Sequence, residues 1–160
     1  SFWNGLKLVK LNSDLKTVAE PQGWFTIASR PRRQFSADSS AGEGAIEAPF
    51  VIRKGKYYYL FASVDYCCRG VNSTYKMIVG RSEKVSGPYL DQHGQSLANG
   101  GGTILLQGDK DWYGVGHNSA YTFDGKDYLV FHGYDAKDNG RSKLLIKNMN
   151  WSADGWPVVE

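Results

Sequence analysis

Short apolar runs bounded by Gly, Pro, Asn and Asp make up most of the chain. No stretch keeps an apolar period of 3.6 residues without a Gly or Pro that breaks it, so the pattern argues against helix. Short apolar segments between turn residues are typical of β-strands. The hydrophobic pattern therefore predicts an all-β protein.

An internal repeat with an offset of seventy residues organises these runs. Residues 120–135 lie over residues 50–65, and each copy is predicted to form a hairpin with its turn at 54–55 or 124–125. The identical positions are Gly55/Gly125, Lys56/Lys126, Tyr58/Tyr128, Phe61/Phe131 and Asp65/Asp135.

Each repeat continues beyond its hairpin. A third strand is predicted at residues 75–81 and again at 142–147, and a turn signal at 86–89 or 154–157 leads into a short outer strand. Four strands in each repeat are typical of a propeller blade.

The whole chain fits this frame, because residues 5–11 resemble the third strand of a blade. The sequence predicts the outer half of one blade at 1–30 and two blades at 45–91 and 115–160, with a Gly-rich connector at 99–102. Propellers use roughly four to eight blades, so two and a half cannot close a ring.

Composition agrees with this fold and removes several functions. Aromatic residues make up 14% of the chain and there are 19 Gly, a mixture that suits sheets with tight turns. The net charge of +3 is balanced and scattered, which gives no reason to expect nucleic-acid binding. No apolar run reaches the length of about 18 residues that a membrane span needs, so no membrane association is expected.

The two cysteines, Cys67 and Cys68, are adjacent. A disulfide between neighbours closes a strained eight-membered ring, and free Cys is often buried. The expectation is a pair of partly buried thiols rather than a disulfide framework or a metal site.

Candidate chemistry lies where the first strand of each full blade begins. Inner strands of a propeller line its central channel, and the seventy-residue offset puts Glu47 and His117 in the same place. A carboxyl buried among apolar residues keeps its proton more readily, which a general acid needs near neutral pH. Two alternatives remain: an exposed loop position for Glu47 and a purely structural role for His117.

Several strings of the sequence resemble glycoside hydrolase family 43, and more narrowly its endo-1,5-α-L-arabinanases, which are five-bladed propellers. They are residues 43–50, 57–61, 65–70, 73–76, 79–82 and 116–119. The resemblance runs through the whole chain.

This resemblance implies an inverting glycosidase that cleaves internal α-1,5-arabinofuranosidic bonds of arabinan. Glu47 matches the general acid, and His117 matches a histidine that reaches a central calcium otherwise bound by water. Ser1, Phe2 and Trp3 match a stretch that lines the arabinan groove, although Trp3 could equally pack between blades.

The resemblance also implies two Asp residues, a base and a residue that tunes the acid, in motifs that no Asp of this chain matches. The expected partner is therefore the N-terminal half of the same propeller, supplied as a second chain. A non-catalytic, carbohydrate-binding half-propeller and an exo-acting arabinofuranosidase or xylosidase remain alternatives. Secretion is expected, because a polysaccharide is cut before it can be imported.

Overall fold

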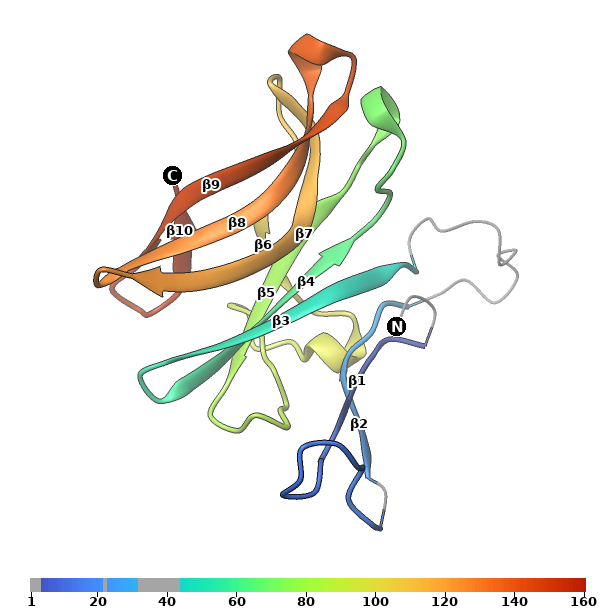
Figure 1. The fold of residues 1–160 in the computed structure, drawn as a ribbon, viewed down its shortest axis with the longest axis vertical. Coiled ribbons are helices and arrows are strands. Elements are labelled where there is room, and N and C mark those ends of the chain that lie inside the picture. The colour runs from blue at the N-terminus through green and yellow to red at the C-terminus, as the bar shows by residue number, and fades with distance from the viewer. Residues whose placement is uncertain (1–3, 22, 32–43) are drawn as a thin grey trace.

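The computed structural model describes residues 4–21, 23–31 and 44–160 (Figure 1). Within them, regular structure consists of β-strands and three short 3-10 turns, Gly70–Asn72, Leu97–Asn99 and Ala136–Asp138. In the part of the chain thus covered, no helix has the length and apolar character needed to cross a membrane.

The strands form three antiparallel sheets. The first pairs β1 (Leu6–Val9) with β2 (Trp24–Ala28). The second has the order β3 (Ile46–Lys54), β4 (Tyr57–Val64), β5 (Lys76–Ser82), β6 (Thr103–Leu106). The third has the order β7 (Trp112–Phe123), β8 (Lys126–Asp135), β9 (Arg141–Trp151), β10 (Pro157–Val159).

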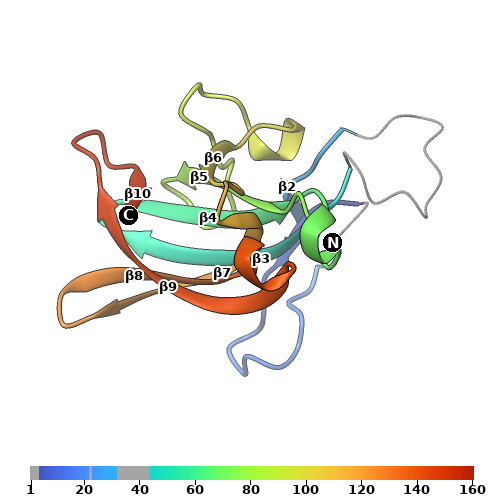
Figure 2. The same cartoon turned by 90° about the horizontal axis from the view of Figure 1, so that it is seen from above.

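These sheets confirm the predicted fold class. The chain is all-β and supplies two four-stranded blades and one two-stranded part of a β-propeller. The two four-stranded sheets lie over one another as layers, and their first strands, β3 and β7, contact each other (Figure 2).

The middle sheet is buried on both faces. Leu60, Ala62 and Val64 of β4 belong to a core shared with β1 and β2, whereas Tyr59 and Phe61 belong to a core shared with β7, β8 and β9. Successive side chains of a strand point to opposite faces, so one strand serves both cores. This explains why β4 reads as one continuous apolar run.

The true register of the repeat differs by one residue from the register that identity suggested. Phe61 and Phe131 lie in the same core, although they belong to neighbouring sheets. Equivalent residues would point to the same side of their own sheets, whereas these two point toward the core between the sheets, so they are not equivalent. The inner strands each bulge at a residue with positive φ, Ala48 (φ 52°) and His117 (φ 56°), which are 69 positions apart. A slip of one residue exchanges the two faces of a strand. The structural counterpart of Glu47 is therefore Gly116, and the expectation that Glu47 and His117 occupy one equivalent place is wrong.

The outer strand of the middle blade also lies elsewhere than predicted. The blade was expected to end at residue 91, but its fourth strand is β6, at 103–106, after the Gly-rich segment 99–102. The reason is Asp91, whose carboxylate accepts hydrogen bonds from the backbone N–H groups of His93, Gln95 and Gly102, each at 2.9 Å. These bonds turn the chain after a single bridge between Leu90 and Arg81.

Asp127 joins the outer ends of the two blades. Its side chain, 5% exposed, accepts hydrogen bonds from Lys54 Nζ and Trp151 Nε1, both at 2.6 Å, and from the Thr122 hydroxyl. Burial opposes its charge, but these three donors outweigh that effect and hold the pKa of Asp127 below its usual value.

We expect Asp127→Asn to lower the free energy of unfolding by about 1–3 kcal/mol, because buried donors lose a charged acceptor. Since the folded pKa is depressed, the stabilisation is present above the unfolded pKa of about 3.9 and is lost as pH falls through the folded pKa. Urea unfolding between pH 7 and pH 3 measures both effects. Asp124→Asn, at an exposed turn, is the matched control. Equal stabilities of the two variants would contradict the assignment.

Candidate active site

Glu47 is the second residue of β3, the inner strand of the middle blade, where it pairs with Ser63 of β4. Its side chain is partly buried, and its Oε1 accepts a hydrogen bond of 2.7 Å from the hydroxyl of Tyr75. Tyr75 is fully buried, and burial, together with the bond to Glu47, raises the pKa of its hydroxyl. The phenol therefore keeps its proton and acts as a donor that fixes one oxygen of the carboxyl group.

Tyr75 is held from two sides by the last blade. A Cβ placed on Gly116 would lie 2.1 Å from Tyr75 Cε1, so the ring rests directly on the backbone of β7. The ring of His132 stacks against the tyrosine at 5.7 Å between centroids and an interplanar angle of 25°. The Tyr75 carbonyl also accepts the N–H of Val115 at 2.8 Å. The residue that orients Glu47 is thus locked into the blade interface.

His117 lies in the bulge of β7, next to this cluster. Its backbone N–H donates to Ser63 Oγ at 2.8 Å, which connects it to the strand partner of Glu47. Its side chain is exposed, and its ring centroid lies 6.4 Å from that of His132. The structure therefore brings the two predicted residues Glu47 and His117 into one cluster, although they are not equivalent in the repeat.

Sequence reasoning did not identify three members of the cluster, Tyr75 and, on β8, His132 and Tyr134. Burial, and then the neighbouring His117, lower the pKa of His132, so its imidazole is neutral at neutral pH. The hydroxyl of Tyr134 lies 3.2 Å from His132 Nε2. In the repeat as the structure defines it, with an offset of 69, His132 is the counterpart of Ser63, a fully buried polar residue of the site. The sequence alone carries no signal for this offset.

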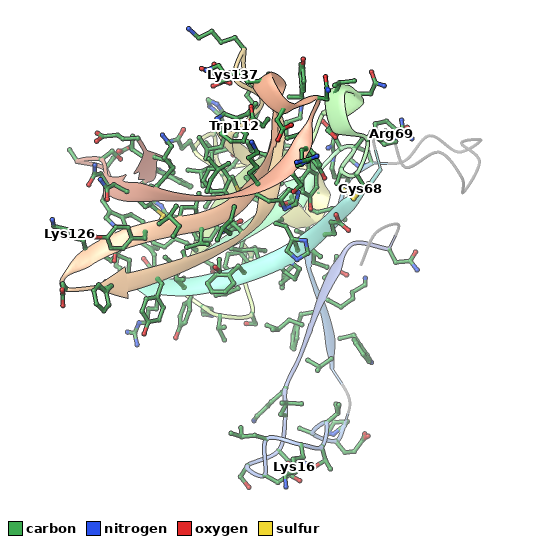
Figure 3. The ribbon with its side chains drawn as sticks, turned by 45° about the horizontal axis from the view of Figure 1, so that its top comes forward. Lys16, Cys68, Arg69, Trp112, Lys126 and Lys137 are labelled. Atoms are coloured by element: carbon green, nitrogen blue, oxygen red, sulfur yellow. A yellow bond between two sulfur atoms is a disulfide. The ribbon has the colours of Figure 1, made fainter. Side chains whose placement is uncertain are left out.

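The expectation of two free thiols is wrong, since Cys67 and Cys68 form a disulfide. They lie in the loop after β4, where a positive φ of 65° at Cys68 turns the backbone tightly (Figure 3). The N–H of Cys68 donates to the Tyr134 hydroxyl at 2.7 Å. The disulfide loop therefore borders the cluster around Glu47.

The two aspartates at the ends of the second strands serve as ion-pair partners. Asp65 binds Arg30 at 2.6 Å and Lys76 at 2.9 Å, and Asp135 binds Lys143 at 2.8 Å. Inverting glycoside hydrolysis needs a second carboxyl group about 6.5–9.5 Å from the acid. The site described here supplies one oriented carboxyl group, that of Glu47.

The described residues offer few side-chain ligands for the expected calcium ion. Among the described residues no group of three or more His, Cys, Asp or Glu side chains could hold a metal ion. Calcium takes about six to eight oxygen ligands, so these residues form no protein cage for it. The exposed imidazole of His117 fits only an ion bound mainly by water. The other predicted site residues, Ser1, Phe2 and Trp3, lie outside the described residues.

The chain is similar to known proteins over nearly its whole length. The profile of glycosyl hydrolases family 43 matches residues 3–157. The chain is 58% identical over 160 residues to the extracellular exo-α-(1→5)-L-arabinofuranosidase of Cellvibrio japonicus, covering 100% of this chain and 46% of that protein. It is 47% identical over 158 residues to the extracellular endo-α-(1→5)-L-arabinanase 1 of Bacillus subtilis, covering 98% of this chain and 44% of that protein.

The fold is also similar to that of a solved structure. The Cellvibrio cellulosa α-L-arabinanase in complex with arabinohexaose matches with a TM-score of 0.92 at 57% identity, covering 100% of this chain and 51% of that one. The chain thus spans about half the length of the relatives it matches.

Gly116 is required by the Tyr75 ring, and its replacement tests the geometry of the site. We expect Gly116→Ala to lower the free energy of unfolding by about 1–3 kcal/mol, because the added methyl group overlaps a ring that has no room to move. Gly23→Ala, whose Cβ would meet Phe25 at 3.5 Å, is the control and should have little effect. Urea unfolding curves compare the two. If Gly116→Ala were as stable as the control, Tyr75 would not be wedged as described.

Proposed function

The chain belongs to glycosyl hydrolases family 43, and from this premise we propose that it forms part of an enzyme that hydrolyses α-1,5-linked arabinofuranosyl bonds of arabinan. The observation that carries the proposal is the oriented carboxyl group of Glu47, bound by a buried tyrosine at the start of an inner strand. The names of the relatives, an arabinofuranosidase and arabinanases, support arabinan as the substrate.

Glu47 is the general acid in this proposal. The Tyr75 hydroxyl donates a hydrogen bond to Oε1 of Glu47, so the proton to be transferred lies on Oε2. Transfer of this proton to the glycosidic oxygen lets the leaving sugar depart as an alcohol, while a water attacks the anomeric carbon from the opposite face. The base that activates this water, and the second Asp that tunes the acid, are carboxylates outside the residues described.

Attack on internal bonds is the predicted mode, and release of sugars from chain ends is the second candidate. The exo mode is favoured by the higher identity to the exo-acting relative, 58% against 47% to the endo-acting one. The two modes differ in how far the groove extends beyond the cleaved bond. The cleavage itself uses the same acid in both modes. A non-catalytic carbohydrate-binding role is the alternative to both.

The partners and location follow from the same relatives. A second chain that supplies the N-terminal half was expected, but each matched relative carries its remaining half in one polypeptide, so they give no support for a two-chain enzyme. Secretion is part of the proposal, supported by two relatives that are named extracellular.

The test is hydrolysis of debranched arabinan by a polypeptide that carries the complete propeller. We expect Glu47→Gln to lower kcat by at least about 10²–10⁴-fold, the usual contribution of a general acid, with a small change in KM. Glu83→Gln, which changes an exposed ion-pair partner of Lys56, is the matched control. Early loss of viscosity indicates internal cleavage, and early release of short products of one length indicates exo action. Binding without hydrolysis by the unchanged protein would favour the non-catalytic alternative.

Calcium bound through His117 and water is the second part of the proposal. We expect His117→Ala to abolish the calcium-binding heat seen in titration calorimetry, because a site with one protein ligand cannot survive its loss. His93→Ala, on the loop after Leu90, is the control. An unchanged calorimetric signal after His117→Ala would remove calcium from this site.

A further inference from the structure

A continuous series of contacts connects the Cys67–Cys68 loop with the carboxyl group of Glu47. The N–H of Cys68 donates to the Tyr134 hydroxyl at 2.7 Å, and that hydroxyl lies 3.2 Å from His132 Nε2. The His132 ring stacks on Tyr75, whose hydroxyl donates to Glu47. The series thereby connects β8, the residue directly before β5, and β3 at one end of the blade interface.

The hydrogen bonds of Tyr134 define the state of His132. A phenol has one proton to donate and accepts through its lone pairs. The Tyr134 oxygen already accepts the N–H of Cys68, so its own proton is available for His132 Nε2. When the Tyr134 hydroxyl donates, Nε2 is the acceptor and the imidazole proton lies on Nδ1, and we assign this tautomer to His132. The ring of Tyr134 meets that of His132 edge-on, at 5.3 Å and 84°, which fixes the imidazole plane as well.

The imidazole plane in turn positions Tyr75. On one side the tyrosine ring cannot move because it rests on Gly116, and on the other it rests on His132. A rotation of the imidazole would open space beside the phenol and let its hydroxyl leave the Glu47 oxygen. The orientation of the carboxyl group therefore depends on a hydrogen bond two side chains away.

The far end of the series is a rigid loop. Within it, the N–H of Thr74 bonds to the Tyr66 carbonyl at 2.9 Å and the N–H of Arg69 bonds to Ser73 Oγ at 3.1 Å. The Arg69 guanidinium lies 3.6 Å from the centre of the Tyr66 ring. The disulfide and these contacts hold the Cys68 N–H in one direction, so Tyr134 receives a fixed donor.

We propose that Tyr134 and His132 are positioning residues for the acid Glu47, and that they transmit the geometry of the disulfide loop to it through Tyr75. In this proposal both residues act on Glu47 through Tyr75. This inference rests on the proposed function, because it concerns the general acid of that reaction.

Tyr134→Phe removes the connecting hydroxyl and keeps the ring, so it is the main test variant. Tyr128→Phe, on the same strand, is the matched control. In a polypeptide with the complete propeller, we expect Tyr134→Phe to lower kcat about tenfold on arabino-oligosaccharides with a phenyl leaving group, which need the acid. With a 2,4-dinitrophenyl leaving group, which departs without a proton, we expect a change below about twofold. KM should stay the same for both.

A second variant separates ring packing from the hydrogen bond. His132→Phe keeps a flat ring against Tyr75 and removes Nε2, and we expect the same selective loss as in Tyr134→Phe. Full activity of His132→Phe on the phenyl substrate would overturn the proposal, because packing alone would then suffice. Equal losses on both leaving groups would also overturn it, since they indicate general damage to the site.

Nitrogen NMR of protein labelled with ¹⁵N-histidine tests the connection without any activity. We expect His132 to be protonated on Nδ1, and its Nε2 resonance to move towards that of a free imidazole nitrogen in Tyr134→Phe but not in Tyr128→Phe. An unchanged resonance would overturn the proposal. If the protein without substitutions failed to cleave arabinan or either glycoside, the proposed function would be wrong. The Nε2 resonance of His132 would still decide whether Tyr134 fixes the imidazole.

Discussion

Tyr75 connects the two four-stranded sheets where their inner strands meet, and both the fold and the site depend on this contact. Its carbonyl accepts a β7 hydrogen bond, its ring rests on Gly116, and its hydroxyl binds Glu47 of β3. The same buried ring therefore sets the spacing of two blades and the direction of one carboxyl group. A displacement that loosened the blade interface would also release the Glu47 carboxyl group, so the stability of the interface and the orientation of this carboxyl group are coupled.

The fold was predictable because burial leaves a strong signal in the middle blade. β4 packs against a core on each face, and its run of apolar residues predicted both the strand and the hairpin. The register of the repeat was less accessible. Phe61 and Phe131 are identical, yet they reach the same core from opposite sheets, and only the bulges at Ala48 and His117 reveal the one-residue slip. The position of the fourth strand of this blade depends on the turn around Asp91. The three backbone N–H groups that bond to the Asp91 carboxylate leave no periodic pattern in the sequence.

The site was predictable only where a residue broke the apolar pattern. Glu47 was found in this way and His117 through the repeat offset and the family resemblance, and the structure brings both into one cluster. Tyr75 and Tyr134 read as ordinary core aromatics, because a sequence does not show which hydroxyl groups find partners inside the protein. His132 lies in a strand of alternating burial and carries no motif. The disulfide was rejected on ring strain, a local argument that omits the tertiary contact between Cys68 and Tyr134.

The inner strands have features that stability alone would not favour. Ala48 and His117 both adopt positive φ, which costs a non-glycine residue roughly 1–2 kcal/mol. Beside His117, the Asn118 side chain is 4% exposed, and both of its polar atoms lack a hydrogen-bond partner among the described residues. Buried polar groups without partners are rare in proteins, and backbone strain collects at functional sites. Both features occur on the strands that carry Glu47 and His117, whereas the outer strands β6 and β10 contain no positive-φ residue. This distribution indicates that the geometry of the inner strands serves the site.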